Sequence, residues 1–224
     1  MFKTLNKILE EVLIIFLVLL ICVGAYIMLD MYHVFQGASA EAVKRVKPDI
    51  ITEDTLKDVS ESVVAWITID DTKLDYPIVQ AEDNTYFVNR DIHGEYSLSG
   101  SIFLDFRNSP DFTDSYSLVY GHHMANDLMF GILDRFKDED FFYAHRTGTL
   151  YVGNIEYRFK VIGFMVTTTA EDEVFNTERS ETRMSFFRNN LMYFQPQDIG
   201  KHIIALTTCK DPGTTDRTVL VISY

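Results

Sequence analysis

The stretch Ile203-Ile204-Ala205-Leu206-Thr207-Thr208-Cys209 decides the fold of this 224-residue chain, because an apolar and largely β-branched run ends there on a cysteine. A polar segment with one proline and one glycine follows, and then Arg217 opens a second apolar run. Apolar runs on either side of a Pro-Gly turn are typical of a pair of strands. The sequence therefore predicts strands over residues 203–208 and 218–223, with a thiol at the end of the first.

The same pattern of short apolar runs between turn residues fills the chain from residue 63 onward. Two helices interrupt this pattern, one from Asn126 or Asp127 to Phe136 and a long one over residues 178–194, because their apolar residues recur at helical spacing. Eight short strands with few helices indicate a mostly β fold, a closed or nearly closed β-barrel with a long helix before the cysteine strand. The predicted strands cover residues 63–69, 74–80, 101–105, 116–120, 150–152, 157–166, 203–208 and 218–223.

Residues 12–29 form an uninterrupted run of eighteen uncharged, mostly apolar residues. At about 1.5 Å per residue, a helix of this length spans roughly 27 Å, close to the hydrocarbon thickness of a bilayer. A cleaved signal peptide is the alternative, but no small-residue cleavage site is evident after the run. Lys3 and Lys7 favour a cytoplasmic N-terminus. The basic cluster at residues 44–47 favours the opposite orientation, but it lies near the outer limit of the distance from the anchor within which such charges set the orientation.

We therefore predict a chain with four parts. They are a cytoplasmic N-terminus (residues 1–11), an uncleaved transmembrane anchor (12–29), a helical stalk and cover (30–62, with candidate helices at 38–46 and 53–59), and a β-barrel domain outside the membrane (63–224).

Charge and cysteine content narrow the function classes. The chain has 20 basic and 33 acidic residues, a net charge of −13, and no basic stripe, so nucleic acid is not an expected partner. Two cysteines are too few for a disulfide framework. Cys22 lies within the apolar run, where it is simply a small apolar residue, so Cys209 is predicted to be a free thiol.

Three kinds of side chain at predicted strand ends form a candidate site for acyl transfer. Cys209 supplies a thiolate, which attacks carbonyl groups readily. His122 and His123 follow the strand over residues 116–120, and neighbouring residues in an extended segment point to opposite sides, so at most one of them faces a given partner as acid or base. Arg217 can donate hydrogen bonds to an oxyanion.

Each of these residues also has an ordinary structural interpretation. The thiol can be a buried core residue, either histidine can make a surface hydrogen bond, and Arg217 can pair with Asp211 or Asp216 at the turn. A zinc site built from Cys209 and the two histidines lacks the Cys-x-x-Cys or His-Glu-x-x-His spacing of common zinc sites, and we expect no metal and no other cofactor.

The order of these residues resembles the sortase family, the membrane-anchored cysteine transpeptidases of Gram-positive bacteria. The family's Thr-Leu-x-Thr-Cys motif appears as Ala205-Leu206-Thr207-Thr208-Cys209, with alanine in place of the first threonine. Arg217 on the next strand and Tyr120-Gly121-His122-His123-Met124 upstream also match. Class B is the most similar class, on the segments Ala65-Trp66-Ile67, Asp75-Tyr76-Pro77-Ile78-Val79-Gln80, Asp83-Asn84-Thr85-Tyr86-Phe87 and Gly100-Ser101-Ile102-Phe103-Leu104-Asp105.

The resemblance implies a role for each residue. Cys209 would attack the carbonyl that follows threonine in a C-terminal sorting signal and form a thioacyl-enzyme, while Arg217 would steady the substrate and the oxyanion. His122 would protonate the departing amine and deprotonate the incoming one, with His123 as the alternative. Thr207 and Thr208 would line the substrate groove.

The resemblance also implies partners. These are surface proteins or pilins with a sorting signal, and an amine acceptor that is either a cell-wall peptide or a pilin lysine. Nothing before His122 resembles the lid of class C sortases. The acidic run Glu171-Asp172-Glu173 resembles the calcium cluster of some class A sortases, although a solvated loop is the simpler interpretation. Two other functions stay open: a papain-like cell-wall peptidase, in which histidine would follow cysteine, and a membrane-anchored β-domain that only binds partners.

Overall fold

The two strands at the C-terminal end are buried on both faces. In β7 (Ile203–Cys209), Ile204 and Leu206 belong to one core cluster, whereas Ile203 and Ala205 belong to another. The residues of β8 (Asp216–Ser223) alternate between the same two clusters. A strand with apolar neighbours on both sides has a continuous apolar run instead of an alternating one. This double burial is the reason for the strong β signal in the sequence.

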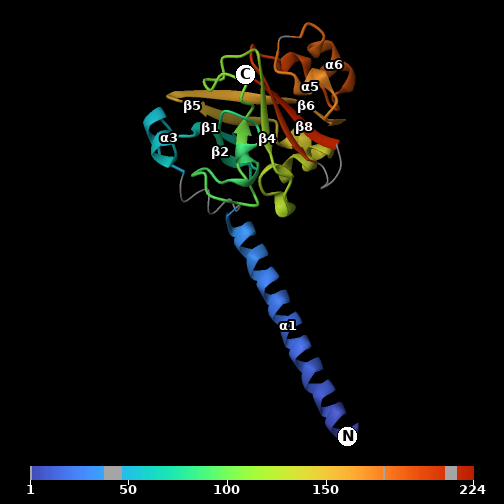
Figure 1. The fold of residues 1–224 in the computed structure, drawn as a ribbon. Helices are drawn as coiled ribbons and strands as arrows, with labels where there is room; N and C mark the ends of the chain where they lie inside the picture. Colours follow the sequence, from blue (N-terminus) through green and yellow to red (C-terminus); the bar gives the residue numbers. More distant parts are fainter. Residues whose placement is uncertain (1, 38–46, 179, 210–215) are drawn as a thin grey trace.

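The computed structural model describes residues 2–37, 47–178, 180–209 and 216–224, and its strands close into one barrel (Figure 1). The order around the barrel is β1-β2-β3-β4-β7-β8-β6-β5, with parallel pairing for β2–β3 and β4–β7 and antiparallel pairing elsewhere. The other strands are β1 (Val63–Ile69), β2 (Asp75–Val79), β3 (Ile102–Leu104), β4 (Tyr116–Gly121), β5 (Thr147–Val152) and β6 (Ile155–Thr168). The predicted closed eight-stranded barrel is confirmed, and each strand lies close to its expected range.

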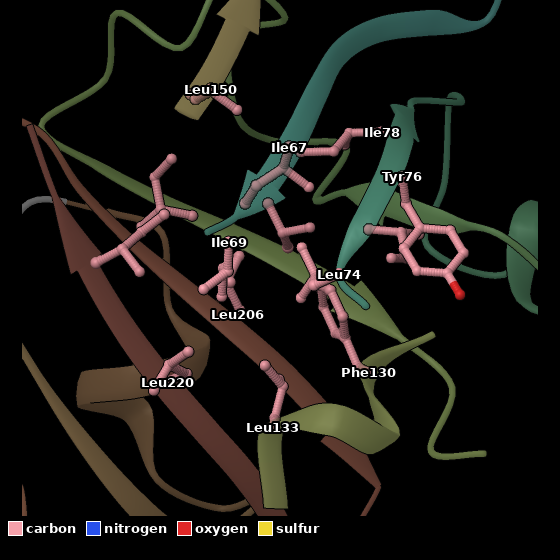
Figure 2. Close-up of a cluster of buried hydrophobic side chains, with 14 of the residues drawn as sticks. Ile67, Ile69, Leu74, Tyr76, Ile78, Phe130, Leu133, Leu150, Leu206 and Leu220 are labelled. Carbon is pink, nitrogen blue, oxygen red and sulfur yellow. The ribbon is translucent and has the colours of Figure 1, made fainter. Parts of the chain in front are cut away.

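The interior cluster combines side chains from the strands with others from the helical segments that follow β4 (Figure 2). Ile67 and Ile69 of β1 lie near Leu206 of β7 in this cluster. Phe130 and Leu133 enter it from the 3₁₀-helix η3 (Phe130–Lys137). Helix η3 therefore acts as a plug that packs against the sheet from the inside.

The helix predicted from Asn126 or Asp127 to Phe136 is not one α-helix. It consists of two 3₁₀ segments, η2 (Ala125–Asp127) and η3, and α4 (Glu139–Ala144) follows them. Asn126, Asp127 and Met129 all have positive φ angles, which an α-helix does not accommodate. Most of η3 is buried, so its apolar residues reflect its role as a plug and not one face of a surface helix.

The prediction of one long helix over residues 178–194 is wrong, because the helix in the structure is much shorter. The structure has the short helices α5 (Asp172–Phe175) and α6 (Arg183–Asn190) in this part of the chain. Leu191 is already extended, and Met192 forms a β-bridge with Phe164 of β6. Leu191 packs on the same outer cluster as α6, so apolar residues continue at similar spacing after the helix has ended. Two further 3₁₀ turns are η1 (Tyr86–Asn89) and η4 (Pro196–Asp198).

The N-terminal helix α1 (Phe2–Gly37) is longer than the predicted anchor and projects from the barrel (Figure 1). Its segment Asn6–Gln36 is long and apolar enough to cross a membrane, and its side chains are exposed as far as His33. At its C-terminal end, Phe35 packs against the barrel core. The predicted helix over residues 53–59 is present as α3 (Glu53–Val59), which Thr52 caps, and the one over residues 38–46 lies outside the described residues.

Candidate active site

The sheet brings the backbones of the three predicted catalytic residues into adjacent positions. Strand β7 pairs with β4 on one side and with β8 on the other. Thr208 of β7 is opposite Gly121 of β4, and Cys209 is opposite Arg217 of β8. His122 directly follows Gly121, so His122, Cys209 and Arg217 occupy one row across three neighbouring chain segments. We call these three residues the site row.

A surface hollow of about 440 Å³ lies at this row. His122, Thr207, Thr208 and Arg217 all line it, so four of the residues predicted for the site share one cavity. The other lining residues come from η1 and the loop before it, from β3 and β4, and from the segment between the end of β6 and the end of α5. They are Asn84, Val88, Phe103, Tyr120, Gly121, Thr169 and Phe175. The hollow is large enough for a few residues of an extended peptide.

The two histidines point to different surroundings, as their extended backbone predicts. His122 Nε2 lies 2.6 Å from the carbonyl oxygen of Val88 and donates to it, so this nitrogen carries a proton. His123 Nε2 lies 3.0 Å from Asp134 Oδ2 of η3 and does not line the hollow. Gly100 packs against the His122 ring at a φ of +56°, where a Cβ would be 2.4 Å from the Val88 oxygen. A glycine is needed at this position because a larger residue would disturb the Val88 contact.

Arg217 and the two threonines line the hollow from the strands β8 and β7 that carry two residues of the site row. Arg217 Nη1 lies 3.2 Å from the backbone oxygen of Asp216, to which it donates. Thr207 and Thr208 are buried, with 1% and 2% of their surface exposed. Within the described part of the chain, Thr207 Oγ1 is a buried polar atom with no hydrogen-bond partner. A buried hydroxyl in this state favours a ligand group that can bond to it.

Behind the hollow lies a polar network that the sequence analysis does not identify. Asp105 is fully buried, and its carboxylate accepts hydrogen bonds from Arg107 (Nε and Nη2, 2.8 Å each, and the backbone N–H, 3.0 Å), Asn84 (2.9 Å) and Tyr120 (3.1 Å). Arg107 also donates to the backbone oxygen of Phe175 at 2.9 Å. The network therefore joins three residues that line the hollow: Asn84, Tyr120 and Phe175.

The network determines the charge states behind the hollow. Burial acts to raise the pKa of Asp105, but the hydrogen bonds from Arg107 and Asn84 outweigh it and hold the pKa below its ordinary value. Burial, together with the Asp105 charge, raises the pKa of Tyr120 far above its ordinary value. Asp105 is therefore a carboxylate and Tyr120 a neutral phenol at neutral pH. Both belong to segments that resemble class B, but their sequence pattern assigns no role to either.

The acidic run Glu171-Asp172-Glu173 has partners within the protein. The Glu171 side chain accepts a hydrogen bond from the backbone of Glu173 at the start of α5, and Glu173 accepts from Ser180 and Thr182. Among the residues that the structure describes, no group of three or more His, Cys, Asp or Glu side chains is arranged to hold a metal ion. Glu171 therefore caps α5, and Glu173 fixes the loop between α5 and α6.

Comparisons with known proteins place this fold in a known family. A family model for the sortase domain matches residues 67–223. Sortase B of Listeria monocytogenes serovar 1/2a is 33% identical over 173 residues, which cover 75% of this chain and 70% of that protein. A class B sortase of Streptococcus pyogenes involved in pilus biogenesis superposes with a TM-score of 0.68 at 33% identity, covering 75% of this chain and 95% of the other. The Staphylococcus aureus sortase B–substrate complex gives 0.68 at 26% identity, with 76% and 82% covered.

The fold and the matched domain define a cysteine transpeptidase. The chain belongs to the sortase family, and it is most like class B within it.

Proposed function

We propose that this protein cleaves a C-terminal sorting signal after a threonine and transfers the new acyl group to an amine. The observation that carries the proposal is the site row. Cys209 and Arg217 are paired across two strands, His122 stands beside them, and a hollow of about 440 Å³ lies at this place. A thiol, an acid–base group and a fixed cation beside one hollow are what acyl transfer through a thioester needs.

In the first half of the reaction, the Cys209 thiolate attacks the carbonyl carbon after the substrate threonine. Negative charge then develops on the carbonyl oxygen, and the Arg217 guanidinium donates hydrogen bonds to it. When the C–N bond breaks, the imidazolium of His122 gives its proton to the departing amine. The products are a thioacyl-enzyme at Cys209 and the released C-terminal part of the signal.

In the second half, an acceptor amine attacks the thioester carbonyl. His122, now neutral, takes the proton that the amine loses, and Cys209 leaves as a thiolate. The acceptor is a cell-wall peptide or a pilin lysine, and the pilus role of the S. pyogenes relative supports including the second. Thr207 and Thr208 bind the peptide near the threonine, which the unpartnered hydroxyl of Thr207 supports.

We assign the acid–base role to His122 and not to His123. His122 lines the hollow, whereas His123 is bonded to Asp134 and is not among the lining residues. The family relationship and the shared hollow also favour an enzyme over a β-domain that only binds partners. A papain-like peptidase is disfavoured because Cys209 ends a strand and His122 precedes it in the chain.

The place of action that we propose is the outer face of a bacterial cell membrane. Helix α1 supports an anchor, since its exposed apolar segment is long enough to span a bilayer. In this arrangement residues 1–11 are cytoplasmic, 12–29 cross the membrane, 30–62 form the stalk and cover, and the catalytic domain (63–224) is extracellular. Protease treatment of intact cells that express the full chain should remove the barrel and leave the N-terminus protected.

The reaction is tested with the full chain in detergent micelles, a library of short peptides that each contain one threonine, and triglycine as the acceptor. The wild type should transfer a threonine-ended acyl group to triglycine, and mass spectrometry should locate a thioacyl adduct on Cys209. Cys209→Ala should abolish transfer, and Cys22→Ala is the matched control because it removes the other thiol. Full activity in Cys209→Ala would overturn the mechanism.

The same assay separates the two histidines and the two acceptors. His122→Ala should lose far more activity than His123→Ala, and the reverse order would contradict our assignment. Supplying a pilin-type peptide with a single lysine in place of triglycine shows which amine is the faster acceptor.

A further inference from the structure

His123 and Thr218 each directly follow a residue of the site row, and both bond to the same carboxylate. His123 comes directly after His122, and Thr218 comes directly after Arg217. Asp134 of η3 accepts a hydrogen bond from His123 Nε2 at 3.0 Å on one oxygen and from Thr218 Oγ1 at 2.7 Å on the other. We call His123, Asp134 and Thr218 the rear clamp.

Thr218 of the rear clamp is on the interior face of β8, and none of the three residues of the rear clamp lines the hollow. Thr218 is fully buried, and the next residues of its side of β8, Leu220 and Ile222, belong to the interior cluster. Asp134 stands on the inner plug η3, next to the buried Leu133. His122 and Arg217, by contrast, line the hollow. Asp134 therefore contacts the two site-row segments from outside the hollow.

No strand pairing connects these two segments directly. Strands β4 and β8 both pair with β7 and not with each other, and the last pairs of β7 are Thr208 with Gly121 and Cys209 with Arg217. At the end of β7, the Asp134 carboxylate joins the segment that carries His122 to the one that carries Arg217. A link of this kind fixes the separation of the acid–base group and the cation.

The position of Asp134 relative to His123 is itself rigid. The backbone N–H of Phe130 donates to the His122 oxygen at 3.0 Å, and His123 forms a β-bridge with Met129. Gly131 packs so tightly on this loop that a Cβ would lie 1.9 Å from the Met124 oxygen. The segment between His122 and Asp134 is thus held together by close backbone contacts of its own.

From this arrangement we propose that Asp134 is a positioning residue, which holds His122 and Arg217 at their working separation by bonding to His123 and Thr218. The proposal rests on the proposed function, because it assigns His122 and Arg217 to the site. In this proposal, η3 positions the residues of the site row in addition to packing in the core. His123 serves as a hydrogen-bond partner of Asp134 and not as an acid or base.

The kinetic test uses the full chain in detergent with triglycine and the peptide that the wild type selects. Asp134→Ala should lower kcat by about 10- to 100-fold, the range expected when reacting groups are displaced by up to roughly 1 Å, and should change KM less than about twofold. Thr218→Val, which removes only the hydroxyl, should lower kcat in the same direction. Thr218→Ser keeps the hydroxyl and should restore it.

The matched control is Asp70→Ala. Asp70 also accepts from a strand threonine, Thr147, and from a cation, Arg158, and none of the three lines the hollow. It should lower thermal stability with kcat unchanged. If Asp134→Ala leaves kcat unchanged, or if Thr218→Ser behaves like Thr218→Val, the positioning role is refuted. The same holds if kcat falls equally in both alanine variants.

A second measurement needs no turnover. In histidine-labelled full chain, the His122 imidazole resonances should move in Asp134→Ala and stay in place in Asp70→Ala. If the wild type transfers no acyl group, the proposed function has failed. The His122 resonances still show whether Asp134 positions the His122 side chain. Unchanged His122 resonances in Asp134→Ala would overturn the proposal.

Discussion

Replacing Asp105 with asparagine tests whether the polar network behind the hollow stabilises the fold. The substitution keeps the size of the side chain but replaces one acceptor oxygen with an NH₂ group. Oδ1 accepts two hydrogen bonds, from the backbone and Nε of Arg107, and Oδ2 accepts three, from Arg107 Nη2, Asn84 and Tyr120. Whichever way the amide is oriented, at least two donors lose their acceptor.

The magnitude follows from these contacts. A hydrogen bond to a charged group contributes about 1.5–3 kcal/mol, but the Arg107 side chain is 38% exposed, and water screens part of its loss. We therefore expect Asp105→Asn to lower the free energy of unfolding by about 2–4 kcal/mol. For a domain of this size, each kcal/mol shifts Tm by roughly 2–4 °C, so Tm should fall by about 4–16 °C. Transfer activity should fall too, because Asn84 and Tyr120 line the hollow.

The pH dependence has a definite sign. The folded-state pKa of Asp105 is lowered, so its contribution to stability is present above the unfolded-state pKa and is lost as the pH falls through the folded-state pKa. The stability difference between wild type and Asp105→Asn should therefore shrink between neutral pH and about pH 3. The single tryptophan, Trp66, is fully buried and gives a fluorescence signal for urea unfolding.

The control for this experiment is Asp70→Asn, whose side chain is 34% exposed and pairs with an exposed arginine. Asp70→Asn should lower the free energy of unfolding by less than about 1 kcal/mol. An unfolding free energy of Asp105→Asn within about 0.5 kcal/mol of the wild type at pH 7 would refute the reasoning, as would a difference that grows in acid.

Three further substitutions test other parts of the fold by urea unfolding. Gly131→Ala should lower the free energy of unfolding by about 1–3 kcal/mol, because its Cβ would meet the Met124 backbone at 1.9 Å; a wild-type midpoint would show that the loop can relax. Arg183→Met removes a buried guanidinium that donates to three backbone oxygens. This variant should lower the free energy of unfolding by several kcal/mol and expose the α5–α6 segment to limited proteolysis. Cleavage at the wild-type rate would contradict this prediction. Burial acts to raise the pKa of Asp198, but Lys160 and Arg146 outweigh it and hold this pKa below its ordinary value. Asp198→Asn should therefore lower the free energy of unfolding at pH 7 and lower it much less near pH 3. An equal effect at both pH values would contradict this prediction.

The sequence predicts the barrel well because its strands carry strong local signals. The run from Ile203 to Leu206 is apolar on both faces of the sheet, and the two-sided burial in the structure explains it. Helices are predicted less well. Phe130 and Leu133 are spaced like helix residues, but they belong to a buried 3₁₀ plug, and Leu191 continues the pattern of α6 from an extended segment.

The site is predicted in part for a similar reason. Thr207, Thr208 and Arg217 stand close to Cys209 in the chain, and a Gly-His pair at a strand end is visible without a structure. Asp105 and Asp134 are not, because each acquires its partners only through the fold, and the class B resemblance of the segment that contains Asp105 assigns it no role. Long-range contacts of this kind leave no periodic trace in a sequence.

The parallel pairing of β4 with β7 affects how the chain folds during its synthesis. Tyr116 is paired with Ile203, so the chain must close a very long loop before this contact forms. Strand β8, the last in the sequence, completes the sheet by pairing with both β6 and β7. High contact order of this kind makes folding slow. A nascent chain that has not yet reached β8 therefore lacks the strand that closes the barrel, and Cys209 has no cross-strand partner until β8 has been synthesised.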